Sequence, residues 1–242
     1  MKDTVIVAKR AFIDTTKTVM SGGWTFIPAY IALSLLFSLI NSSLGILSIF
    51  GGFLAYILLV LEKSVYARAL NDLTLTDKIS YRNFSYNFGN YFYNIMNTYF
   101  IIYIVKFVVN LFVYNLINLN SEILHYSTLA LFITENIIFS PIFETTYVEN
   151  IGGVSAFRRT IDFMKENWFP WLILNIPYLM MLYVETIFSS KTIGMNIVLK
   201  VLMYVVPPLY LIFRGKLYYL LANSNKRKTV SYTHLWAGWQ GR

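Results

Sequence analysis

Six stretches of the chain are almost uninterrupted runs of apolar residues, and shorter polar connections separate them. Each run comes close to the ~20 residues that an α-helix needs to cross ~30 Å of hydrocarbon. Strands rarely exceed about ten residues, and a lipid-facing barrel alternates polar and apolar positions, so the pattern predicts helices. The predicted spans are Trp24–Asn41, Leu44–Leu61, Tyr91–Leu119, Ile123–Phe143, Trp168–Phe188 and Met195–Phe213.

Lys and Arg are distributed unequally between the two sets of connections that join these spans. The two terminal segments and the connections after the second and fourth spans hold nearly all of them, whereas the other turns hold only Lys191. Because cytoplasmic loops carry the excess of Lys and Arg, this alternation predicts six spans with both termini in the cytoplasm. The sequence therefore predicts an all-α, polytopic transmembrane helical bundle of the cell membrane, with a single domain over residues 1–230.

Composition agrees with a membrane protein. Of the 242 residues, 57% are hydrophobic and 13% are charged, whereas a soluble domain usually carries about 25% charged residues. The formal net charge is +8, and the basic residues flank the apolar runs. We therefore expect the chain's partner to be a bilayer with anionic headgroups and not a nucleic acid.

The residues that commonly perform catalysis or bind metals are few. The chain has no cysteine, and its two histidines, His125 and His234, are too far apart in sequence for metal-ligand spacing. No nucleophile–base set and no nucleotide-binding loop can be found. The sequence therefore predicts no enzymatic activity, no metal site and no cofactor.

Two basic segments precede the first and fifth predicted spans, and each has apolar residues near helical spacing. Such segments can lie in the headgroup plane as amphipathic interfacial helices. The alternative is a cytoplasmic helix that closes the base of the bundle. The predicted headgroup contacts are Lys9, Arg10 and Lys17 in the first segment and Arg158, Arg159 and Lys165 in the second.

The two basic segments also resemble each other. The pattern Ala-Phe-x-x-Thr at residues 11–15 precedes Trp24, and the same pattern at residues 156–160 precedes Trp168. Residues 82–92 form a weaker middle copy. Three repeats of an interfacial helix followed by a transmembrane hairpin would give the six spans.

One continuous segment carries a resemblance to a known family. It is Tyr-Val-Glu-Asn-Ile-Gly-Gly-Val-Ser-Ala-Phe-Arg-Arg at residues 147–159, continuing to Asn167-Trp168. It resembles a recurring segment of a family of bacterial six-span membrane proteins of unknown function. That family is similar to the membrane domain fused to some glycerophosphodiester phosphodiesterases. The sequence contains no phosphodiesterase catalytic domain, so the resemblance implies the membrane architecture and an accessory role, without hydrolase activity.

Ionisable residues inside predicted spans are the main candidates for function, because burying an unpaired charge there costs at least about 2.5 kcal/mol. Lys106 and Glu135 lie at similar depth in the third and fourth spans, which predicts an intramembrane ion pair. A snorkelling or cavity-facing lysine and an ion or substrate pathway are the alternatives. Glu185 and Lys200 repeat this arrangement in the last hairpin.

The final residues, 231–242, differ abruptly in character from the rest and resemble translated vector sequence. We interpret them as a disordered or non-native tail. The remaining chain predicts a non-enzymatic accessory or scaffold protein of the membrane, with other membrane-protein subunits as partners. The alternative is a small transporter or permease subunit whose path is lined by the third to sixth spans.

Overall fold

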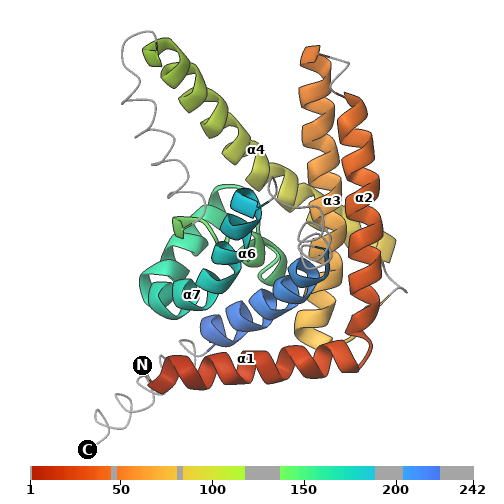
Figure 1. The fold of residues 1–242 in the computed structure, drawn as a ribbon, viewed down its shortest axis with the longest axis vertical. Coiled ribbons are helices and arrows are strands. Elements are labelled where there is room, and N and C mark those ends of the chain that lie inside the picture. Colours follow the sequence, from red (N-terminus) through yellow and green to blue (C-terminus); the bar gives the residue numbers. More distant parts are fainter. Residues whose placement is uncertain (1, 45–47, 81–83, 118–136, 189–203, 224–242) are drawn as a thin grey trace, which may run out of the picture.

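The computed structural model describes residues 2–44, 48–80, 84–117, 137–188 and 204–223, and over these residues the fold is helical, without strands (Figure 1). The prediction of an all-α protein is confirmed for this part of the chain. The elements are α1 (Lys2–Met20), the 3-10 helix η1 (Gly23–Thr25), α2 (Phe26–Leu44), α3 (Ser48–Thr76), α4 (Phe84–Ile117), α6 (Ile142–Val148), α7 (Val154–Phe188), and a final helix at residues 204–223.

Helix α1 lies crosswise at the base of the α2–α3 hairpin (Figure 1). The chain changes direction at Gly22, whose φ of 131° is open to glycine but strained for other residues. The face of α1 that points into the protein carries small residues, Ala11, Thr15 and Thr18, and all three are buried. The opposite face exposes Phe12 and other large apolar residues together with the basic residues of this helix.

Helix α7 combines two elements that the sequence predicts as separate. It runs without a break from the second basic segment through the fifth predicted span, with Pro170 and Pro177 inside it. The first basic segment ends at Ser21-Gly22-Gly23, whereas the second has Glu166-Asn167 before its tryptophan and no residue that requires a turn. Helix α4 likewise contains most of the middle repeat copy and the third predicted span in one helix.

The first and third repeat copies nevertheless match in burial. Ala11 and Ala156 are fully buried and Thr15 and Thr160 are buried, whereas Trp24 and Trp168 are both more than half exposed. In both copies the alanine and the threonine therefore pack into the protein, and the tryptophan lies on its surface.

Polar side chains lie inside this fold, and large apolar side chains lie outside it. One apolar core joins α2, α3, α4 and α6 with Ile212 of the final helix, and a second joins α1, α7 and the final helix. Beside these cores, charged and polar residues are buried, among them Ser64, Arg68, Asp72, Thr98, Glu144, Thr145, Thr146, Asn175 and Lys216. The exposed residues include Leu35, Leu36, Leu39, Phe53, Phe100, Phe107, Leu111, Ile173 and Ile176.

Among the described helices, one stretch has both the length and the apolar composition to cross a membrane. It is Gly23–Ser43, with 21 residues, and it contains nearly all of α2. This stretch coincides with the first predicted span.

The segment that carries the family resemblance forms a tight turn against α4. Asn150 and Gly153 both have positive φ, at 53° and 62°. The Gly153 amide donates to Thr98 Oγ1 at 2.9 Å, and Asn94 Nδ2 donates to Asn150 Oδ1 at 3.0 Å. A Cβ atom on Gly152 would lie 2.6 Å from the backbone of Asn94. The Asn-x-Gly-Gly motif thus lets the chain approach the α4 backbone closely.

We expect Gly152→Ala to lower the free energy of unfolding by about 2 kcal/mol, as overpacking typically does. The added methyl group meets backbone atoms of Asn94, which cannot rotate away. Thermal unfolding of the purified protein in detergent measures the change. Gly89→Ala is the matched control, because nothing lies within 4 Å of a Cβ there; in a helix interior this change stabilises by up to about 1 kcal/mol. Equal unfolding temperatures for the two variants would contradict the close approach.

Candidate functional site

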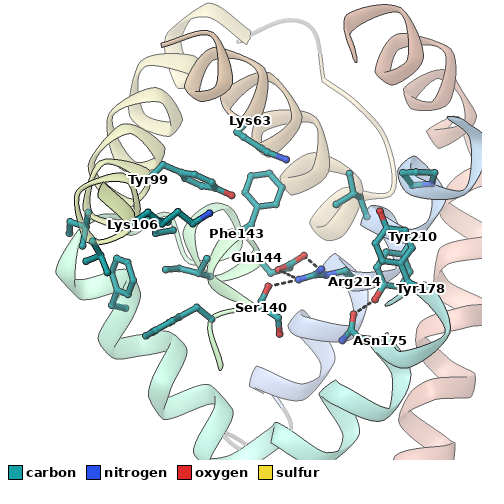
Figure 2. Close-up of a pocket in the computed structure, with 18 of the residues that line it drawn as sticks. Lys63, Tyr99, Lys106, Ser140, Phe143, Glu144, Asn175, Tyr178, Tyr210 and Arg214 are labelled. Carbon is teal, nitrogen blue, oxygen red and sulfur yellow. Dashed lines mark hydrogen bonds and ion pairs between the residues drawn. The ribbon is translucent and has the colours of Figure 1, made fainter. Parts of the chain in front are cut away.

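Three charged residues from distant parts of the sequence line one cavity. Lys63 lies two residues past the predicted inner end of the second span, and Glu144 and Arg214 directly follow the ends of the fourth and sixth. The structure brings all three to the wall of a cavity of about 540 Å³ (Figure 2). Residues at the predicted inner ends of the second, fourth and sixth spans therefore meet at this cavity.

Glu144 and Arg214 form a buried ion pair at the centre of the site, in which one of the two nitrogen–oxygen contacts has hydrogen-bond geometry (Figure 2). Arg214 Nε lies 2.7 Å from Glu144 Oε1, and its terminal nitrogen donates to Glu144 Oε2 at 2.8 Å. The Glu144 side chain is 0% exposed and the Arg214 side chain 17%. The same terminal nitrogen of Arg214 donates to the Ser140 carbonyl. A planar guanidinium matches a carboxylate in this geometry, which a lysine could not reproduce.

Aromatic rings hold Arg214 in place. Its guanidinium carbon lies 5.1 Å from the centre of the Trp171 ring and 5.7 Å from that of Tyr210. The Trp171 indole donates to Ser140 Oγ at 2.7 Å. Tyr210 donates to Asn175 and stacks on Tyr178, with 4.1 Å between ring centres. Cation–π contacts and hydrogen bonds thus fix the orientation of the arginine.

The opposite wall of the cavity carries two lysines. Lys63 Nζ lies 5.6 Å from the centre of the Phe143 ring, and Lys106 reaches the cavity from α4 (Figure 2). The lining on α4 is otherwise mainly apolar, with Ile101, Ile102 and Val105. Among the lining residues that the structure describes, Glu144 is the one carboxylate, and it already pairs with Arg214. Lys63 beside this apolar wall therefore favours an anion that also carries an apolar part.

A second charged network lies at the base of the protein. Lys216, in the final helix, places its Nζ 2.5 Å from Asp77 Oδ1 and donates to the Thr74 carbonyl at 2.9 Å. Thr18 of α1 donates to the same Asp77 oxygen at 2.5 Å. Burial alone would raise the pKa of Asp77, but the hydrogen bonds from Lys216 and Thr18 outweigh it and hold that pKa below its usual value. This network joins α1, α3 and the final helix.

The segment that carries the family resemblance, residues 147–159, contributes a third charged contact. Arg159 Nε lies 2.8 Å from both oxygens of Glu149, and Tyr218 donates to Glu149 Oε1 at 2.8 Å. The hydrogen bond that Arg159 donates to Glu149 raises the pKa of Arg159 further above its already high value. The final helix is therefore tied to the rest of the fold through residues 214, 216 and 218.

The structure places the predicted headgroup contacts in two groups. Arg159 turns toward Glu149, so it is half-buried and part of the ion pair. The others are exposed, and two of them make loose ion pairs within their own helices, Arg10 with Asp14 at 3.9 Å and Lys165 with Asp162 at 3.3 Å. The exposed ones are Lys9, Arg10, Lys17, Arg158 and Lys165.

The predicted intramembrane pairs stay predictions. Lys106 lines the cavity, but Glu135 and Lys200 lie outside the described residues. Glu185 is on α7, and its side chain is not among those described. Within the described part of the chain, no group of three or more His, Cys, Asp or Glu residues could hold a metal ion.

Sequence reasoning did not identify the central trio of Lys63, Glu144 and Arg214. Lys63 and Arg214 belong to the basic connections and terminal segment that the Lys and Arg distribution places on the cytoplasmic side, so the sequence pattern gives them no partner. A signal was nevertheless present, because each residue comes within two positions of the predicted inner end of an even-numbered predicted span.

Searches of protein-family models, of curated proteins and of solved structures give no match to this chain.

We expect Glu144→Gln to lower the free energy of unfolding by about 3 kcal/mol, because it leaves the Arg214 guanidinium buried without a counter-charge. Thermal or denaturant unfolding in detergent measures the loss. Asp162→Asn is the control, since it breaks an exposed pair with Lys165 that contributes well under about 1 kcal/mol. A Glu144→Gln protein as stable as the Asp162→Asn protein would show that the ion pair is not needed for the fold.

The Asp77 contacts predict an acid-sensitive stability. Because the folded-state pKa of Asp77 is below its unfolded value of 3.8, the unfolded chain takes up the proton first as pH falls. The stabilisation is therefore complete above about pH 5 and decreases as pH falls through 4 toward the folded-state pKa. Unfolding temperatures recorded from pH 3 to pH 7 should fall less steeply at the acid end for Asp77→Asn than for the parent chain. Parallel curves would contradict the assignment.

Proposed function

We propose that this chain is an integral membrane protein with six spans and cytoplasmic termini that acts as a non-enzymatic accessory or scaffold component. The observation that carries the proposal is the inverted distribution of polarity. Leu36 and Phe107 are each 52% exposed, whereas Glu144 and Thr98 are completely buried. Large contiguous apolar surfaces are rare on soluble monomers and mark contact with lipid or protein.

The dimensions of the helices support this reading. Helices α3 and α4 contain 29 and 34 residues, which at 1.5 Å per residue extend about 43 and 51 Å. Both exceed the ~30 Å of the hydrocarbon layer. In Figure 1 the C-terminal ends of α2 and α4 point toward the same end of the protein, away from α1. Such an arrangement agrees with odd-numbered spans that all run outward from the cytoplasmic side.

The position of α1 and the exposed basic residues supports the proposed orientation. Helix α1 runs across the foot of the hairpin, as an interfacial helix would (Figure 1). Its outer face combines exposed apolar residues such as Phe12 and Ile13 with Lys9 and Lys17. Apolar side chains of this kind enter the acyl boundary while lysines reach the phosphates.

The geometry of the central pair favours a non-catalytic role. Both oxygens of Glu144 are engaged by Arg214, and a carboxylate held in this way is a poor general base. The pair instead joins the final helix to α6 at a distance of 70 residues in sequence. A structural role of this kind fits a scaffold component.

One observation favours a small transporter or permease subunit as a second candidate. The cavity is lined by residues of α4, α7 and the final helix, which overlap with the third, fifth and sixth predicted spans. Transport would require this cavity to open alternately to the two sides of the membrane.

The absence of cysteine allows a direct test of the topology, because every introduced cysteine is unique. Intact cells expressing Ser43→Cys should react with a membrane-impermeant maleimide, since this residue lies at the predicted outer end of the first hairpin. Cells expressing Arg158→Cys should react only after permeabilisation. Labelling of Arg158→Cys in intact cells, or recovery of the protein in the soluble fraction without detergent, would refute the proposal.

A further inference from the structure

The cavity offers a binding site that goes beyond a scaffold role. We propose that it binds the phosphate-bearing headgroup of an anionic amphiphile of the inner membrane leaflet, with Lys63 as the principal contact and the apolar chain along α4. The proposal rests on the membrane assignment above and names a ligand class for this protein.

Charge is the first argument. The only carboxylate among the described lining residues is Glu144, and Arg214 engages both of its oxygens. Lys63 points into the same cavity, and no carboxylate of the described residues lies within ion-pair distance of its Nζ. Its closest described contact is the face of Phe143, at 5.6 Å from the ring centre. An anion in the cavity would supply the charge partner that the ring does not provide.

Depth is the second argument. Lys63, Glu144 and Arg214 follow the predicted inner ends of three spans within two residues. In a bilayer this level is the boundary between hydrocarbon and headgroups, where the phosphates of the inner leaflet lie. The cations therefore stand at the height at which a lipid phosphate is present.

The apolar wall selects an amphiphile over a free anion. Ile102 and Val105 line the cavity from α4, and Val105 is 51% exposed on the outer surface of that helix. Ile104 and Phe107 continue the exposed apolar surface on either side of it. A chain attached to a phosphate beside Lys63 can leave the cavity along these residues. The volume of about 540 Å³ is within the ~300–1,000 Å³ typical of small-molecule sites.

The experiment titrates the purified full-length protein in a neutral detergent with four probes and follows thermal unfolding. The probes are dioctanoyl phosphatidylglycerol, dioctanoyl phosphatidylcholine, glycerol 3-phosphate and inorganic phosphate. Dioctanoyl phosphatidylglycerol should raise the unfolding temperature of the parent chain, and the other three should not. Lys63→Gln should weaken its apparent affinity about fivefold, and Lys63→Arg should retain most of it.

Two further variants make the result unambiguous. Lys78→Gln removes one exposed cation that neither lines the cavity nor belongs to the predicted headgroup contacts, and this variant should bind like the parent chain. Ile102→Trp fills the cavity without changing charge and should also lose binding, so the test survives if Lys63→Gln fails to fold.

Three outcomes would overturn the proposal. They are equal shifts with the two lipids, equal weakening by Lys78→Gln and Lys63→Gln, and a shift with glycerol 3-phosphate that depends on Lys63. The last of these would assign the site to a soluble phosphate ester. None of them would affect the cysteine-labelling pattern, so failure of this inference is separable from failure of the membrane assignment.

Discussion

The constraint on which this structure depends is that apolar side chains form its surface while charged side chains form part of its interior. Residues such as Leu36 and Phe107 expose half of their area, and Glu144 exposes none. In water this distribution would be unfavourable on both counts, because apolar area would stay hydrated and charges would lose their hydration. With lipid as the proposed solvent both features are expected, since polar groups must then find partners inside the protein.

The internal partners in turn determine how the helices assemble. The final helix projects Arg214, Lys216 and Tyr218 to three different acidic residues, namely Glu144, Asp77 and Glu149. These contacts come from α6, from the end of α3 and from the turn before α7. Breaking one partner of such a pair leaves a buried charge, which costs more than the pair contributes. The Glu144–Arg214 pair forms one wall of the cavity, and Lys63 and Lys106 line it from the other side.

The apolar pattern predicted helices and the approximate positions of several of them, because length and hydrophobicity are local properties of a sequence. The first predicted span, Trp24–Asn41, agrees with α2 within three residues at each end. The points at which helices end were harder to predict. The second basic segment and the fifth predicted span form one helix, α7, because Glu166-Asn167 lacks the glycines that end α1. The trio of Lys63, Glu144 and Arg214 depends on contacts between residues 70 or more apart, which spacing along one helix does not reveal. Arg159 pairs with Glu149, which lies ten residues earlier in the chain, across the turn before α7.

The most direct test of the membrane solvent is the accessibility of spin labels on the exposed apolar faces. The protein is reconstituted in bilayers with a label at position 36 or 107, and at position 165 as the reference. Leu36→Cys and Phe107→Cys labels should collide readily with oxygen, which concentrates in lipid, and rarely with a water-soluble nickel complex. The Lys165→Cys label should show the reverse preference. Ready collision of the nickel complex with the labels at 36 and 107 would mean that these faces meet water, and the account would be wrong.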